Sequence, residues 1–222
     1  EFNCGHVINN AYGLQCPVIC KLVNRALTKG RVDAIVQSTD KNFMVPVGGA
    51  VVVSQDQAFI DAVSGCYPGR ASMTPILDLF ITLLSMGEDG YRGLLTERQR
   101  LCVVLQERLP GVLTKHGLEV LPAPRNSIST AISLNALIPS SKPGHLERLT
   151  FLGSMLYQRS VSGCRVVACT NEVKTMAGYA FCNWGAHMQH YPHSYFTVAC
   201  SIGITDEDIG LFLDRLDKVI LK

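Results

Sequence analysis

The sequence has 222 residues, of which 47% are hydrophobic and 17% are charged, and its formal net charge is +2. This composition supports a sizeable folded core and excludes a disordered chain, and so small a charge gives no reason by itself to expect nucleic acid. No apolar run is long enough to span a membrane, and the first residues have neither the basic nor the apolar region of a signal peptide.

The nine cysteines contain no C-x-x-C pair, and most of them lie within apolar stretches. We therefore expect reduced, buried thiols and a cytoplasmic location. Cys16 and Cys20 share one helix face, and His187, His190 and His193 are evenly spaced. Two ligands are weak evidence for a metal, and Pro192 prevents a helix across the histidines, so we predict an exposed loop and no metal site.

The first 75 residues alternate between strand and helix patterns. The predicted elements are strands at 7–8, 31–37 and 51–53 and helices at 16–28 and 56–64. This order indicates a parallel sheet of the α/β class. So few strands, with one cut at the first residues, make an incomplete sheet, and we expect the chain to be part of a longer protein.

The pattern then changes to longer helices followed by short strands. The apolar run at 75–86 predicts a buried helix, and 90–116 predicts a long amphipathic helix. Its exposed side would carry Arg98, Arg100, Glu107 and Arg108. Further predicted elements are strands at 118–121, 129–134, 165–168 and 195–202 and helices at 146–157 and 208–222, the last opened by a capping box at 205–208. We predict an α/β region over 1–75, a connecting helix at 76–87 and a smaller α+β domain over 88–222.

Lys41 follows the predicted strand at 31–37 and is bounded by Pro46 and the pair Gly48 and Gly49. Enzymes that use pyridoxal 5'-phosphate (PLP) place a lysine where a core strand ends, so that its amine can form a Schiff base. The spacing alone leaves open an ordinary lysine in a loop between strands.

The run N9-N10-A11-Y12-G13 follows the first predicted strand and supplies the second part of such a site. PLP enzymes of the aspartate aminotransferase fold usually hold the pyridine nitrogen with an acidic residue at a strand end. Asn9 stands at this place, and an amide holds that nitrogen protonated less firmly than a carboxylate does. A simple turn is the alternative for this run.

Several stretches resemble the O-phosphoseryl-tRNA(Sec) selenium transferase family, also called the selenocysteine synthases. They are V-I-N-N-A-Y-G at 7–13, V-Q-S-T-D-K-N-F-M-V-P-V-G-G-A at 36–50, Y-P-G-R-A-S at 67–72, G-S-M-L at 153–156, V-S-G at 161–163 and F-L-x-R-L-D at 212–217. The resemblance covers nearly the whole chain and corresponds to the C-terminal half of the family. It implies a fold-type I PLP-dependent transferase, of which this chain holds part of the large domain and the C-terminal α+β small domain.

The resemblance also implies the reaction and its partners. The family converts phosphoserine on tRNA(Sec) to selenocysteine, with selenophosphate as selenium donor and PLP as cofactor, and it works as a homotetramer. Lys41 would be the Schiff-base lysine and general base, and Asn9 would face the pyridine ring. Because the family chain is about twice this length, we expect the chain alone to be inactive.

Three further positions are matched by motif. Arg70 would hold the phosphate of phosphoserine, because a guanidinium fork suits a dianionic phosphate. Arg159 would read a base next to the CCA end of the tRNA. Thr28 stands where the family has a tRNA-contacting arginine, so that contact is in doubt unless Lys29 or Arg31 replaces it.

Two alternative hypotheses for the function remain. The protein could be another fold-type I PLP lyase or decarboxylase acting on a free amino acid, which would need neither the phosphate-binding Arg70 nor the tRNA-contacting Arg159. It could also be a folded, non-enzymatic domain, in which Arg70 forms a surface ion pair and Arg159 is a solvated residue at a helix end.

Overall fold

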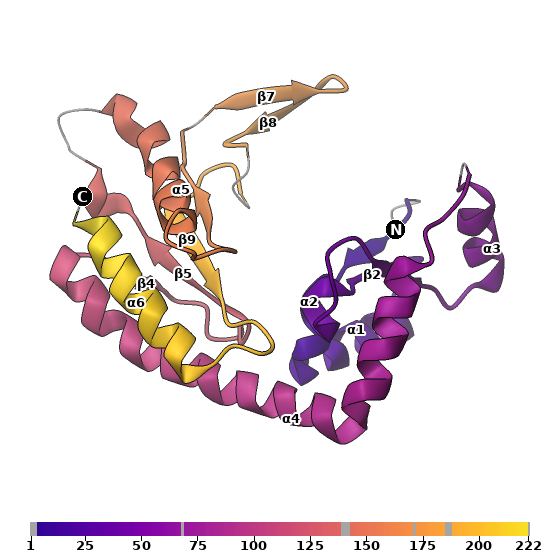
Figure 1. The fold of residues 1–222 in the computed structure, drawn as a ribbon. Coiled ribbons are helices and arrows are strands. Elements are labelled where there is room, and N and C mark those ends of the chain that lie inside the picture. The colour runs from indigo at the N-terminus through magenta and orange to yellow at the C-terminus, as the bar shows by residue number, and fades with distance from the viewer. Residues whose placement is uncertain (1–3, 68, 139–142, 171, 185–187, 222) are drawn as a thin grey trace. The chain divides into compact units, whose positions relative to one another are not determined.

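The computed structural model describes residues 4–67, 69–138, 143–170, 172–184 and 188–221 (Figure 1). The chain divides into two compact units. Unit 1 comprises Glu1–Arg98 with Ser201–Gly203, and unit 2 comprises Gln99–Cys200 with Ile204–Lys222. Each unit is described by itself.

Unit 1 is built on a three-stranded sheet in the order β1 (Val7–Asn9), β2 (Ala34–Ser38) and β3 (Ala50–Val53). Strands β1 and β2 are parallel and are joined by helix α1 (Pro17–Lys29), as the sequence predicts. Strand β3 runs antiparallel to β2, so the prediction of a parallel sheet is wrong for this strand. The connection from Ser38 to Ala50 is too short for a parallel crossover, which needs a dozen or more residues.

Three shorter helices complete the connections of unit 1. They are the 3-10 helix η1 (Gly13–Gln15), the single turn α2 (Asp40–Phe43) and α3 (Gln57–Gly65), which begins at an N-cap where Asp56 accepts a hydrogen bond of 2.9 Å from the Ala58 amide. None of the residues of α1 or α3 is fully buried. The described part of unit 1 therefore lacks helices packed deeply on its sheet.

Helix α4 (Thr74–Leu113) combines both long helices of the sequence analysis, and Figure 1 shows a bend between its two arms. The bend lies at Gly87, whose φ of 65° is left-handed and favours glycine. The prediction that the first arm is buried is wrong. Phe80 is 60% exposed and Leu84 is 69% exposed, and none of the residues of this arm is fully buried.

Unit 2 contains an antiparallel sheet in the order β4 (Val120–Leu121), β5 (Ser129–Ser133), β9 (Tyr195–Ala199) and β6 (Arg165–Val167). Its helices are the end of α4, α5 (Phe151–Tyr157) and α6 (Asp206–Ile220), with 3-10 turns η2 (Thr114–His116), η3 (Asn135–Leu137) and η4 (Pro143–Thr150). Leucines of α4 pack with Ile132, Phe196 and Leu216 in one apolar cluster that joins three helices to the sheet. This is the main core of the described chain.

Of two local features of unit 2, the sequence predicted the capping box of α6 but not the hairpin of β7 and β8. The capping box is confirmed: the Thr205 hydroxyl accepts from the Asp208 amide at 3.1 Å, and Asp208 accepts from the Thr205 amide at 2.9 Å. The hairpin of β7 (Val173–Met176) and β8 (Tyr179–Cys182) was not predicted. Its two turn residues have positive φ, at Ala177 and Gly178, as a tight hairpin requires, but only the second is a typical turn residue.

All nine cysteines lie within the described residues and are free thiols. Cys16, Cys102 and Cys200 are buried, whereas Cys4 and Cys66 are exposed, so burial holds for only some of them. Burial raises the pKa of the Cys164 thiol to about 11. None of the helices that the structure describes is long and apolar enough to cross a membrane.

Candidate functional site

The candidate site lies where the parallel strands β1 and β2 end at the same edge of the sheet. Asn9 is the last residue of β1, and Ser38 is the last residue of β2, one turn before Lys41. The two loops that leave these strands are in contact, because the Asn42 side-chain amide donates a 2.7 Å hydrogen bond to the Ala11 carbonyl. In α/β sheets such a crevice beyond the carboxyl ends of the strands is the usual place for a ligand.

Lys41 lies in the turn α2 with its side chain 34% exposed. Its Nζ donates to the Ser38 hydroxyl at 3.1 Å and forms an ion pair with Asp40 at 3.3 Å. The ammonium also lies 5.7 Å from the centroid of the Tyr12 ring, within the range of a cation–π contact. The amine is therefore oriented toward the loop after β1 and accessible from outside.

Asp40 is the charged neighbour that balances Lys41. Burial disfavours the charged form of Asp40, but the hydrogen bonds from Ser38 and Lys41 together outweigh it, so the pKa of Asp40 lies below its ordinary value. Asp40 therefore stays ionised at neutral pH and holds the amine in place.

Asn9 is exposed, and its side-chain oxygen accepts a 3.2 Å hydrogen bond from the Ala11 amide. This bond turns the side chain along its own loop and fixes its orientation at the strand end. Asn10, the next residue, is buried.

The residues around Lys41 suit PLP. The Lys41 amine can hold an aldehyde, the Ser38 hydroxyl lies beside it, and Asn9 offers an amide from the neighbouring strand. A Cβ at Gly49 would collide with the Thr39 hydroxyl, so glycine lets the chain after the lysine turn pass close to that turn. The Thr39 hydroxyl is buried and has no hydrogen-bond partner among the described residues.

Two polar side chains that the sequence analysis did not assign to the site support the lysine turn. Gln15 donates to the Lys41 carbonyl, and Arg98 donates to the Gln15 carbonyl at 3.2 Å. The prediction that Arg98 faces solvent is wrong, since it is 1% exposed. Helical periodicity placed it on the charged face of α4, where Arg100 and Arg108 are exposed, but Arg98 itself meets the loop after β1.

Arg70 follows α3 in an exposed segment of unit 1. Its guanidinium makes no hydrogen bond or ion pair with the described part of the chain, and the structure does not join it to Lys41. Pro68 of the same Y-P-G-R motif lies outside the described residues.

The two positions matched to tRNA contacts make only local hydrogen bonds. Arg159, at the end of α5 in unit 2, is half-buried and donates to the Met155 carbonyl at 2.8 Å. Thr28 is exposed in the last turn of α1, where its hydroxyl donates to the Arg25 carbonyl at 3.0 Å. Arg31 is paired with Asp33 at 2.8 Å, which leaves Lys29 as an exposed cation next to Thr28.

The histidine run lies in unit 2. His187 lies outside the described residues, His190 is exposed, and His193 Nδ1 is 3.0 Å from the Ser133 hydroxyl. Within the described residues, no three His, Cys, Asp or Glu side chains form a group that could hold a metal ion.

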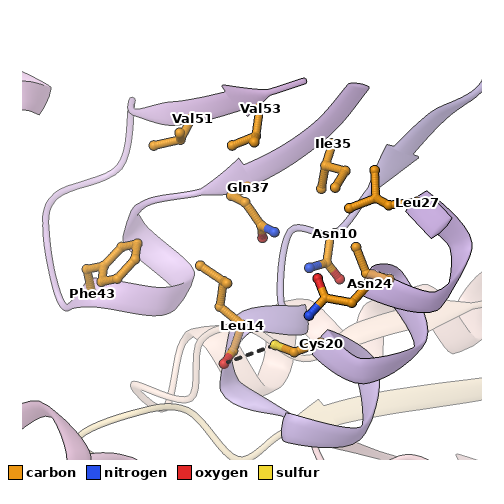
Figure 2. Close-up of a pocket in the computed structure, with 11 residues that line it drawn as sticks. Asn10, Leu14, Cys20, Asn24, Leu27, Ile35, Gln37, Phe43, Val51 and Val53 are labelled. Atoms are coloured by element: carbon orange, nitrogen blue, oxygen red, sulfur yellow. Dashed lines mark hydrogen bonds between the residues drawn. The ribbon is translucent and has the colours of Figure 1, made fainter. Parts of the chain in front are cut away.

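A pocket of about 340 Å³ lies between α1 and one face of the sheet (Figure 2). Its walls are mostly apolar, and Figure 2 shows the Gln37 amide pointing into it from β2 toward Asn10 and Asn24. Neither Lys41 nor Asn9 is among the residues that line it. Asn10 and Phe43, which belong to the two loops of the strand-end site, are among its lining residues.

Comparison with known proteins identifies the family of the chain. The family model described as O-phosphoseryl-tRNA(Sec) selenium transferase, SepSecS, matches residues 1–221. The chain belongs to the SepSecS family. The enzyme of that name from Dictyostelium discoideum is 44% identical over 100% of this chain and 48% of its own length. The Methanopyrus kandleri protein is 35% identical over 98% of the chain and 46% of its own length.

Solved structures support the same fold. The crystal structure of an archaeal SepSecS matches with a TM-score of 0.77 at 32% identity, covering 97% of this chain and 44% of that one. The structure of Oryza sativa TDC with PLP matches with a TM-score of 0.60 at 14% identity, which shows a shared fold alone. The predicted fold class, mixed α/β of fold-type I PLP enzymes, is confirmed, and the chain spans about half the length of the SepSecS relatives it matches.

Proposed function

We propose that the protein to which this chain belongs converts O-phosphoseryl-tRNA(Sec) to selenocysteinyl-tRNA(Sec) with selenophosphate as selenium donor. The observation that carries the proposal is the position of Lys41, at the end of β2 and in contact with the loop of Asn9, in a chain of the SepSecS family. We also propose that the reaction takes place in the cytoplasm on a homotetramer, with unit 1 as part of the PLP-binding large domain and unit 2 as the small domain.

Bound PLP would supply the electron sink that allows proton loss at the substrate α-carbon, departure of phosphate and addition of selenium. Lys41 would hold the cofactor through its amine, and the same amine would take the substrate α-proton as general base. Asp40 and Ser38 keep that amine near the strand end between these tasks. Asn9, on the neighbouring strand, would help to hold the cofactor ring.

Arg70 supplies the phosphate contact in this proposal, because a bidentate guanidinium neutralises the departing dianion. Its exposure and freedom from described partners leave the guanidinium available for a ligand. Arg159 contacts the tRNA near its CCA end, and Lys29 compensates for the missing arginine at Thr28. None of these contacts is needed by an enzyme acting on a free amino acid.

The decisive experiment uses the full-length protein and measures selenocysteinyl-tRNA(Sec) formation. Lys41→Ala removes both the cofactor attachment and the general base, so we expect the rate to fall by on the order of a thousandfold or more. Lys21→Ala, an exposed lysine of α1, serves as the matched control and should retain the wild-type rate. Normal product formation by Lys41→Ala would refute the proposal.

Arg70→Ala separates the selenium transferase from a fold-type I lyase or decarboxylase. The substitution should abolish turnover of phosphoseryl-tRNA, while a free amino acid substrate would be processed as before. For the chain alone we propose inactivity, because it spans only about half the length of its SepSecS relatives. Adding PLP to the isolated chain should then leave it colourless, and a yellow adduct at Lys41 would contradict this.

A further inference from the structure

Three almost fully buried polar side chains, of Asn42, Gln15 and Arg98, lie in the Lys41 turn or support it. Asn42 is 0% exposed, Arg98 1% and Gln15 2%, in a unit that buries few apolar side chains among its described residues. Burying such groups costs free energy unless they form hydrogen bonds. Their bonds are directed at the backbone of the lysine turn and of the loop after β1.

Asn42 joins the two loops through a single amide group. Its Nδ2 donates to the Ala11 carbonyl at 2.7 Å and to the Ser38 carbonyl at 2.6 Å. The Ala11 amide bonds to the Asn9 side chain, and the Ser38 hydroxyl accepts from Lys41 Nζ. One side chain therefore fixes the separation between the backbone segments that carry Asn9 and Lys41.

The lysine turn cannot hold this geometry by itself. Helix α2 has four residues and no side-chain hydrogen bond at its N-cap, and a helix that short is unstable in water without tertiary contacts. Gln15 adds a second support by donating to the Lys41 carbonyl, and Arg98 in turn fixes the backbone of Gln15. The position of the amine thus depends on these side chains.

We propose that Asn42 is a positioning residue that holds the Lys41 amine against the Asn9 loop. Gln15 supports the lysine turn through the Lys41 carbonyl, and Arg98 supports Gln15. This inference rests on the proposed function, because it assigns the amine a reaction partner bound between the two loops. A displacement on the ångström scale at a reacting group costs up to about a hundredfold in rate. Loss of the Asn42 donors should therefore slow the reaction of Lys41 without removing any group that touches the cofactor.

The test uses the full-length protein, PLP as the probe and borohydride to fix the label, with peptide mapping of each lysine. The measured quantity is the ratio of labelling at Lys41 to labelling at the exposed Lys21. Asn42→Asp keeps the size of the side chain but turns an oxygen toward two carbonyls, and we expect the ratio to fall about tenfold or more. Asn42→Leu removes the donors without adding a charge and should act in the same direction.

Asn126→Asp is the matched control, since it makes the same change in a turn of unit 2 and should leave the ratio unchanged. Folded Asn42 variants that label Lys41 at the wild-type ratio would overturn the inference alone. If neither variant folds, Asn42 is a structural residue and the inference also fails. Absence of labelling at Lys41 in the wild type would overturn the proposed function as well.

Discussion

Units 1 and 2 differ in what they bury. Unit 2 encloses a continuous apolar cluster in which Leu101, Phe196 and Leu216 are fully buried. The apolar side chains that unit 1 buries among its described residues are Cys16, Ala34, Ile35 and Val45, and its most deeply buried groups include the polar Gln15, Asn42 and Arg98. Unit 2 therefore has a continuous apolar core, whereas several of the side chains that unit 1 buries are polar and lie next to the candidate site.

This difference indicates how the two units depend on their surroundings. Apolar burial is the main favourable contribution to folding, so a unit with a closed core can carry its own stability. Unit 1 leaves Ile76, Phe80 and Leu84 exposed along one arm of α4, a contiguous apolar surface that soluble proteins usually cover. The relatives are about twice as long as this chain. We expect the stability of unit 1 to depend on contacts with the part of the longer protein that this chain does not include.

The largest difference should appear when a large apolar side chain is truncated in each unit. Phe196→Ala removes a fully buried ring from the core of unit 2 and should cost about 3–5 kcal/mol of unfolding free energy in this chain. Leu84→Ala truncates an exposed side chain of unit 1 and should stay within about 0.5 kcal/mol. Urea denaturation measures both, and equal costs would show that unit 1 covers this arm of α4 after all.

A smaller effect is expected at the helix N-caps. In both units an N-cap side chain accepts a hydrogen bond from a backbone amide of the first turn. Thr205→Ala removes the capping box of α6, which packs five buried residues, and should cost about 1 kcal/mol in thermal unfolding. Asp56→Ala removes the N-cap of α3, none of whose residues is fully buried, and should hardly move the transition. A larger shift for Asp56→Ala would mean that α3 is coupled to the folding of a core.

The smallest expected effect is on the pH dependence of stability in unit 2. The His116 ring nitrogen lies 2.6 Å from Asp217, and this hydrogen bond lowers the pKa of Asp217, with Lys115 adding to the effect. A carboxylate with a lowered pKa in the folded state stabilises the protein above its unfolded pKa, about 3.9, and loses that contribution as the pH falls through the folded value. Asp217→Asn should therefore lose less stability than the wild type between about pH 5 and pH 3.

Denaturant unfolding at several pH values measures this slope. Asp214→Asn, on the same helix, leaves the His116 contact intact and should follow the wild-type curve. Identical slopes for Asp217→Asn and the wild type would show that this surface pair contributes nothing measurable.

Local patterns in the sequence determined much of this protein. Strand and helix periodicity located most elements, the Thr205–Asp208 capping box was correctly predicted at the start of α6, and the run around Lys41 indicated the family. Such features depend on residues close together in the chain, so they can be read without knowing the fold. The site assignments at Asn9, Arg70 and Arg159 remain predictions that rest on matched motifs.

Only the tertiary structure decided the direction of β3, the burial of Arg98, the exposure of the first arm of α4 and the contacts of Asn42. Each of these features depends on which segment packs against the residue in the fold. The residues adjacent in the sequence do not determine that segment. Periodicity in the sequence predicts whether a helix face is apolar or charged. Burial and hydrogen bonding also require a second surface packed against that face, and only the tertiary structure determines whether one is present.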